Sequence, residues 1–265
     1  MEGQPAEALC HALAPPVDDT QRLPCTSDPA TTRGSAQRLV ERVPGDDLPV
    51  QRRVGDRHGT PFAEGRVTTP PGWREAYRTW IAGGWNGLSA DPDHGGQGLP
   101  LVLNAACNEM WNAASIAFGL CPLLTAGGIE ALAQHGSDDL KTRYLAKLIS
   151  GEWTGTMNLT EPAAGSDVGA LRTKAEPQAD GTYRISGQKI FITYGEHDMA
   201  DNIVHLVLAR LPDAPAGSKG ISLFIVPKFL VNADGSLGER NGVSVGALEH
   251  KMGIHGNATA VMNFD

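Results

Sequence analysis

The hydrophobic period of this chain changes at Gly151, and this change restricts the possible folds more than any other feature. Before it, apolar residues recur at helical spacing: Trp73, Tyr77, Trp80 and Ile81 stand at i, i+4, i+7 and i+8. After it, apolar residues alternate with polar ones or form short blocks, which is typical of strands. Helices followed by strands, without alternation, predict an α+β fold built from two adjacent domains.

The first half of the ordered region is predicted to be helical, and we expect order to begin near Pro70. The expected elements are a helix over 73–81 ended by Gly83 and Gly84, a loop over 91–100, a buried helix over 101–117, a helix over 123–134, and a helix that Ser137 caps and Gly151 ends. Asp138 and Asp139 fall in the first turn of the last helix, where carboxylates complement the helix dipole.

The second half is predicted to form strands. Tyr183 to Thr193 suggests a hairpin that turns at Ser186-Gly187. The segments 203–209 and 221–226 are apolar throughout and predict buried strands, and 243–248 and 258–264 are further strand candidates.

Residues 1–52 contain prolines in every stretch that could otherwise become a helix, and their apolar residues show no period. We therefore assign no domain to this segment and expect it to be disordered or translated out of frame. The predicted domains are a partial helical domain over 53–152 and a β domain over 153–265.

Net charge, cysteine spacing and apolar content indicate which partners and which cellular location to expect. The net charge is −8 and no block of Lys and Arg occurs, which disfavours nucleic acid as a partner. The four cysteines show no CxxC spacing and are expected to be free thiols. We also find no signal peptide and no apolar run near the ~20 residues of a membrane helix, so the expected location is cytoplasmic without a membrane span.

The segment from Met157 to Leu171, MNLTEPAAGSDVGAL, has the physical character of a phosphate and cofactor loop. Thr160 and Ser166 offer hydroxyl groups, and the small residues leave the backbone approachable. Successive N–H groups around Gly165 to Asp167 could form an anion-binding nest. On spacing alone, the alternative is that Ser166-Asp167 only caps a turn.

Four ordered segments resemble the acyl-CoA dehydrogenase family. They are GGWNGLSADPDHGGQGLP over 83–100, TEPAAGSD over 160–167, GQKIFIT over 187–193 and HKMGIHGNATAVMNFD over 250–265. The resemblance covers about 53–265 and is strongest to bacterial 3-methylmercaptopropionyl-CoA dehydrogenase-like members. His94 in the first segment and Ala258 in the last depart from the usual residues without breaking the pattern.

The resemblance implies FAD-dependent α,β-dehydrogenation of an acyl-CoA, with electron-transfer flavoprotein or a similar acceptor, in a homo-oligomer. It implies flavin contacts at Met157, Asn158, Leu159, Thr160, Gly165, Ser166, Phe191, Ile192 and Thr193, with Ser166 also on the CoA path. Phe191 matches the aromatic that stacks on the flavin, and Thr193 the hydroxyl near flavin N5. No GxGxxG follows a strand, which is consistent with a flavin held without a Rossmann turn.

The resemblance also implies that the catalytic glutamate lies in a C-terminal helical bundle, which we expect this chain to lack. No catalytic residue is therefore assigned here, Glu161 and Glu196 included, although Glu161 could shape its loop. His250 and His255 lack the helical spacing of a metal pair, and no metal site is expected. The alternatives are a non-catalytic homologue and the orphan product of a broken gene.

Overall fold

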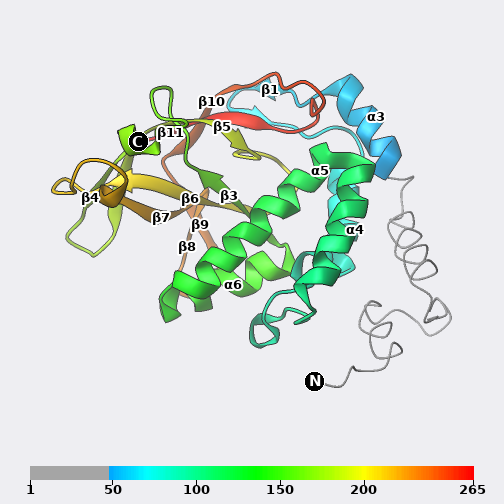
Figure 1. Cartoon of the computed structure of the whole chain (residues 1–265), viewed down its shortest axis with the longest axis horizontal. Helices are drawn as coiled ribbons and strands as arrows, with labels where there is room; N and C mark the ends of the chain where they lie inside the picture. Colours follow the sequence, from blue (N-terminus) through cyan, green and yellow to red (C-terminus); the bar gives the residue numbers. More distant parts are fainter. Residues whose placement is uncertain (1–47) are drawn as a thin grey trace.

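The computed structural model describes residues 48–265, with side chains from residue 52 onwards. The expectations for residues 1–47 lie outside this range. Helices group on one side of the molecule and strands on the other (Figure 1). The helices are α3 (Leu48–His58), α4 (Trp73–Ala82), α5 (Leu101–His135) and α6 (Asp138–Ser150).

Regular structure is present before Pro70, where the sequence predicts that order begins. Helix α3 starts at Leu48, before the expected boundary at residue 52, and it has Pro49 in its first turn, where a missing backbone N–H is tolerated. The short strands β1 (Phe62–Ala63) and β2 (Arg66–Val67) then pair as an antiparallel hairpin before Pro70.

The predicted helix over 73–81 is confirmed as α4, whose buried face holds Trp73, Tyr77 and Trp80. The cap of α6 is also confirmed, because Ser137 accepts a hydrogen bond from the backbone N–H of Leu140. Gly151 ends α6 in the left-handed conformation, as expected.

The two helices predicted over 101–117 and 123–134 appear as two helical segments of the 35-residue element α5. They meet at a kink at Ser115, whose φ of −157° and ψ of 91° are not helical, so the division lies earlier than predicted and Pro122 falls inside the second segment. The start of α5 is not buried, since Leu101 and Val102 are more than two-thirds exposed. By length and composition α5 could cross a membrane, but half of its most apolar window is buried inside the protein, as in a core helix.

Besides the β1–β2 hairpin, the described strands form one mixed seven-stranded sheet and a second small hairpin. The sheet follows the order β10 (Val243–Leu248), β11 (Thr259–Phe264), β5 (Tyr183–Thr193), β4 (Lys174–Pro177), β6 (Asn202–Arg210) and β3 (Trp153–Asn158), with β7 (Ile221–Pro227) paired to β6. The second hairpin consists of β8 (Phe229–Val231) and β9 (Leu237–Arg240). Strand β6 is almost wholly buried as predicted, whereas β7 is only partly buried and exposes Leu223.

The predicted hairpin over 183–193 is wrong, because β5 is one continuous strand of 11 residues. Its first part pairs with β4 and its second part with β11. Gly187 (φ 151°) stands mid-strand, where a Cβ would lie 2.6 Å from Thr173 Oγ1. The glycine thus serves close packing and marks no turn.

Helix α5 packs against β3 and joins the two halves. Thr125 Oγ1 accepts a hydrogen bond from Gly155 N (3.1 Å), and the Tyr194 hydroxyl donates to the carbonyl of Ala117 (2.6 Å). Tyr77 on α4 donates to the carbonyl of Gly151 (2.7 Å). These buried contacts bring the start of β3 and the end of β5 against the helices.

Candidate functional site

The two segments singled out in the sequence, 157–166 and 191–193, lie side by side. Met157 and Asn158 end β3, and Leu159 and Thr160 follow it directly. The backbone N–H of Ile190 donates to the carbonyl of Thr160 (2.8 Å). Thr156 Oγ1 donates to the carbonyl of Thr193 (2.6 Å), so the structure brings the end of β3 against the end of β5.

A buried ion pair fixes the loop that follows β3. The Glu161 carboxylate accepts hydrogen bonds from Lys189 Nζ (2.8 Å), from the backbone N–H groups of Arg172 (2.6 Å) and Thr173 (3.0 Å), and from Thr173 Oγ1 (2.6 Å). Lys189 Nζ also donates to the carbonyl of Leu159 (3.0 Å). Burial acts to raise the pKa of Glu161, but the hydrogen bonds from Lys189, Thr173 and the backbone outweigh it, so the pKa lies below its usual value.

The loop presents Gly165 and Ser166 to the surface. Glu161 and Ala164 exchange two backbone hydrogen bonds of 3.0 Å, which close a tight turn and bury Ala164. Among the described residues, the backbone N–H groups of Gly165, Ser166 and Asp167 make no hydrogen bond, and Gly165 and Ser166 are exposed. This arrangement leaves donors available for an anion, as the sequence suggests.

A β-bulge turns Phe191 towards solvent. Between the pairs Ala260–Ile192 and Met262–Lys189, two residues of β5 oppose the single residue Val261. Lys189 and Ile192 consequently both face the core, and Phe191 is 45% exposed with φ 60°. Positive φ strains a non-glycine residue by about 1–3 kcal/mol, and such strained residues cluster at functional sites. Bulges often re-aim side chains beside active sites.

Lys251 lies on the exposed aromatic ring, with its Nζ 4.0 Å from the centroid of Phe191. The ring is therefore an accessible aromatic surface with a cation on it. Nothing in the pattern of the sequence indicated this lysine, because it lies 60 residues away in the connection between β10 and β11.

Two predicted contact residues can offer only their backbone atoms. Asn158 is fully buried, with Nδ2 3.2 Å from His205 Nδ1, and the side chain of Ile192 lies in the core. Thr193 is half-buried and pairs with Thr259 on β11. Met157, Leu159 and Thr160 are also half-buried.

The two glutamates excluded as bases in the sequence are both engaged in ion pairs. Glu161 is held as described, and Glu196 contacts Lys228 and Arg240. Among the described residues, no group of three or more His, Cys, Asp or Glu side chains could hold a metal ion.

Comparison with known proteins identifies the family. Residues 51–152 match the acyl-CoA dehydrogenase N-terminal domain, and residues 156–265 match the acyl-CoA dehydrogenase middle domain. The chain belongs to the acyl-CoA dehydrogenase family. The helical and β parts seen in the structure correspond to these two domains.

Curated relatives and a solved structure agree with this assignment. The chain is 53% identical to the 3-methylmercaptopropionyl-CoA dehydrogenase of Ruegeria pomeroyi over 84% of its own length and 38% of that protein. It is 45% identical to a butyryl-CoA dehydrogenase of Syntrophomonas wolfei over 84% of its length and 37% of that protein.

The structure resembles the acyl-CoA dehydrogenase of Bacillus anthracis solved in complex with FAD. The TM-score is 0.65 at 24% identity, over 89% of this chain and 36% of that one. At this identity the likeness concerns the fold alone. The chain spans 38%, 37% and 36% of the length of these three relatives.

Proposed function

We propose that this chain forms the FAD- and acyl-CoA-contacting part of an enzyme that introduces a double bond between the α and β carbons of an acyl-CoA thioester. The single observation that supports this most strongly is the bulge at Phe191. It exposes an aromatic ring at strained backbone geometry beside a loop with unpaired N–H groups. Membership of the family and the names of the two curated relatives support the same reaction class.

The residues of the site fit FAD. The exposed Phe191 ring provides a stacking surface for the isoalloxazine, and the N–H groups at Gly165 to Asp167, with the Ser166 hydroxyl, suit a pyrophosphate. Bound FAD would supply the hydride acceptor for the substrate β carbon. Asn158 and Ile192 would contribute through backbone atoms, because their side chains are buried.

Thr193 is proposed to place its hydroxyl near flavin N5, where negative charge develops during reduction. Its backbone is positioned from both sides, by the Thr156 hydroxyl and by pairing with Thr259. A preorganised donor at such a position stabilises the transition state without reorganisation at the moment of reaction.

The proton-abstracting base is proposed to lie outside the site residues described here. Glu161 is occupied by four donors and Glu196 by two cations, so neither carboxylate is free to approach a substrate carbon. We further propose electron-transfer flavoprotein or a similar acceptor as the redox partner, a homo-oligomeric assembly, and a cytoplasmic location without a membrane span.

The test compares the chain with a fusion that joins it to the part of the Ruegeria pomeroyi relative beyond the matched region. Both are loaded with FAD and mixed anaerobically with butyryl-CoA or 3-methylmercaptopropionyl-CoA while flavin absorbance is recorded. We expect the fusion to bleach and the chain alone to bind FAD weakly without bleaching.

The Thr193→Ala fusion should bleach on the order of 10²-fold more slowly. Bleaching by the chain alone would place the base among its own residues and contradict the assignment. A fusion that binds FAD but is not reduced by any acyl-CoA would instead favour the non-catalytic homologue.

A further inference from the structure

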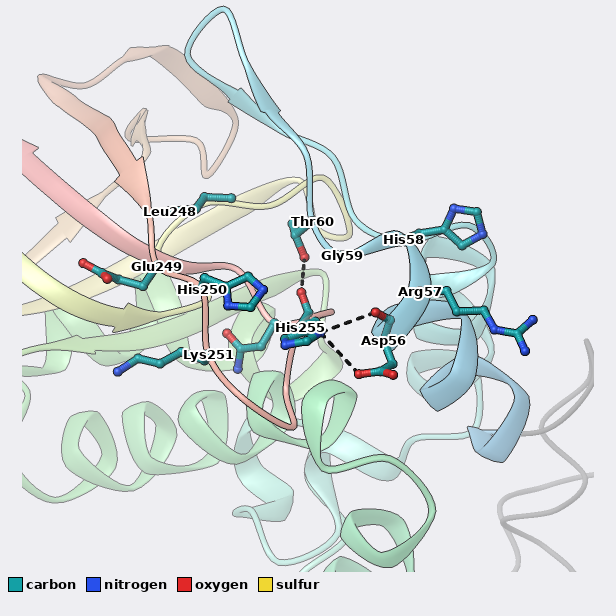
Figure 2. Close-up of a pocket in the computed structure, with 11 residues that line it drawn as sticks. Asp56, Arg57, His58, Gly59, Thr60, Leu248, Glu249, His250, Lys251 and His255 are labelled. Atoms are coloured by element: carbon teal, nitrogen blue, oxygen red, sulfur yellow. Dashed lines mark hydrogen bonds and ion pairs between the residues drawn. The ribbon is translucent and has the colours of Figure 1, made fainter.

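Lys251 lies on the ring of Phe191, and none of the flavin contacts proposed above uses its charge. Its Nζ is 4.0 Å from the centroid of that ring. Figure 2 shows its side chain extending away from Asp56 and Arg57 of α3. The ammonium makes no hydrogen bond and no ion pair with any residue that the structure describes, so its charge is not balanced by a neighbouring carboxylate.

The backbone that carries this lysine is held in place. The N–H of Ile254 donates to the carbonyl of Lys251 (3.4 Å), and the N–H of Asn257 donates to the carbonyl of Ile254 (2.8 Å), which closes two successive turns. Thr60 Oγ1 donates to the carbonyl of Gly256 (2.9 Å) and ties the β10–β11 connection to the segment after α3. A lysine on a fixed backbone loses less conformational freedom when its ammonium stays on the ring.

The other side chains at this end of the site carry no unbalanced charge. Lys189 is fully buried, and its Nζ is 2.8 Å from the Glu161 carboxylate, which offsets its charge. Phe191 and Thr193, the residues proposed to contact the isoalloxazine, are neutral. Among the described residues of this end of the site, Lys251 therefore supplies a positive charge that no carboxylate offsets.

Any planar ring that stacks on Phe191 lies close to this ammonium. On one face of the phenyl ring it meets the Lys251 side chain itself, and on the other face only the thickness of the phenyl ring separates the two. Salt screens such short separations incompletely, since the Debye length is about 8 Å at physiological ionic strength.

The proposed reaction changes the charge beside this ring. The β carbon of the substrate gives up a hydride, which carries two electrons and one proton, to an isoalloxazine that is neutral when oxidised. The reduced isoalloxazine then holds one negative charge. A cation nearby attracts the negatively charged form and has little effect on the neutral form.

We propose that Lys251 makes this site bind reduced FAD in preference to oxidised FAD, by placing its ammonium beside the isoalloxazine that stacks on Phe191. The inference rests on the proposed function, because it requires a flavin on that ring. It adds a residue of the β10–β11 connection to a site otherwise built from the ends of β3 and β5. The preference also makes the bound flavin a better hydride acceptor, since the state formed by hydride transfer is the one stabilised.

Anaerobic equilibrium dialysis of the full chain against oxidised FAD, and separately against FAD reduced with dithionite, tests the proposal at mildly alkaline pH. The readout is the ratio of the two dissociation constants, because the adenine, ribityl and phosphate contacts are common to both forms. Lys251→Met removes the charge and keeps an unbranched side chain, and Lys251→Arg keeps the charge. Lys141→Met on α6, where the lysine is also partly exposed, removes one positive charge from the helical half and is the matched control.

We expect the preference for reduced FAD to fall by roughly tenfold in Lys251→Met, as for the loss of one nearby charge that is partly screened by solvent. Lys251→Arg and Lys141→Met should keep the preference of the parent. Equal weakening of both forms in Lys251→Met would show that the lysine only supports the packing of Phe191, and would overturn the proposal. An equal loss of preference in Lys141→Met would trace the effect to net charge and overturn it as well.

The same experiment separates this inference from the proposed flavin site. If FAD binds, and binds more weakly in Phe191→Ala, but the ratio is unchanged in Lys251→Met, only the role of Lys251 is wrong. If the parent chain binds neither form of FAD, the flavin site and the role of Lys251 are both overturned.

Discussion

At the scale of single residues, the Glu161–Lys189 pair has a structural consequence that the sequence only hinted at. The GQKIFIT segment resembles a flavin-contacting segment of the family, and its lysine is fully buried and holds the preceding loop through Glu161 and the carbonyl of Leu159. The loop geometry that presents Ser166 therefore depends on a side chain of the neighbouring strand. Local sequence patterns do not reveal such a contact between residues 28 positions apart.

Lys189→Met should destabilise the protein by about 3–5 kcal/mol, because it leaves the Glu161 carboxylate buried without its cation. The matched control is Lys147→Met, which removes a half-exposed pair with Glu152 and should cost no more than about 1 kcal/mol. Urea unfolding of both variants measures the difference. Equal losses would show that Glu161 is compensated by Thr173 and the backbone alone.

Ser166→Ala should weaken FAD binding by about 1 kcal/mol or somewhat more, because it removes a hydroxyl donor from an anion site whose N–H groups remain. Ser244→Ala removes another exposed hydroxyl, on β10, and serves as the control. Fluorescence titration with FAD gives both affinities. If the two variants bind equally well, Ser166 plays no part in holding the cofactor.

At the scale of elements, the sequence predicted α4 and α6 with their ends, placed the division of α5 too late, and missed α3. Helix α4 follows from its apolar spacing, and α6 from its Ser137 cap. The hairpin assigned to β5 failed because Ser186-Gly187 looks like a local turn, whereas Gly187 is required by the close approach of Thr173, the residue before β4. The short strands β8 and β9 were missed, since neither is long enough to show a period.

The kink in α5 provides a test at this scale. Ser115 Oγ is buried without a hydrogen bond among the described residues, so Ser115→Ala should leave stability unchanged or raise it by up to about 1 kcal/mol. Thr125→Val, in the same helix, removes a buried hydroxyl that bonds Cys121 and Gly155 and should cost about 1–3 kcal/mol. Thermal unfolding of both variants measures the two changes in stability. If Ser115→Ala lowers stability more than Thr125→Val does, the Ser115 hydroxyl does stabilise the kink and this prediction is wrong.

At the scale of the whole molecule, two histidines are buried in the β domain in their neutral form. Burial lowers the pKa of His197 to about 3, with Lys228 and His205 adding to the effect. Burial likewise lowers the pKa of His205 to about 3, helped by Lys228 and Arg240. The Thr154 hydroxyl and the backbone N–H of Met199 contact opposite nitrogens of His197, which suits a neutral ring.

This burial predicts acid sensitivity in a defined window. The unfolded chain binds protons at these histidines below the ordinary pKa of 6.5 while the folded chain does not, so stability falls as pH drops from 6.5 towards 3. Each histidine should contribute about 1.4 kcal/mol per pH unit within that window. His205→Gln should reduce the slope measured by urea unfolding, and exposed His135→Gln should not.

The sequence predicted only some of the features of the candidate flavin site. The resemblance predicted Phe191 and Ser166 as flavin contacts, and the structure shows both side chains exposed on the surface. The sequence did not predict the bulge, because the bulge arises from the pairing of β5 with β11, which joins residues about 70 positions apart. It did not predict the contact of Lys251 with Phe191 either, because this pairing brings the connection before β11 close to β5. Register in a sheet is set by such distant partners.

The central claim is that Phe191 and its surroundings form a flavin platform, and FAD affinity of the full chain tests it most directly. Fluorescence titration would compare the protein with Phe191→Ala and with Tyr183→Ala, which removes an equally exposed aromatic at the opposite end of β5. Because stacking of a planar ring on an aromatic side chain is worth about 1–3 kcal/mol, Phe191→Ala should weaken binding by roughly tenfold or more. Tyr183→Ala should bind as the parent does, and unchanged affinity in Phe191→Ala would contradict the account.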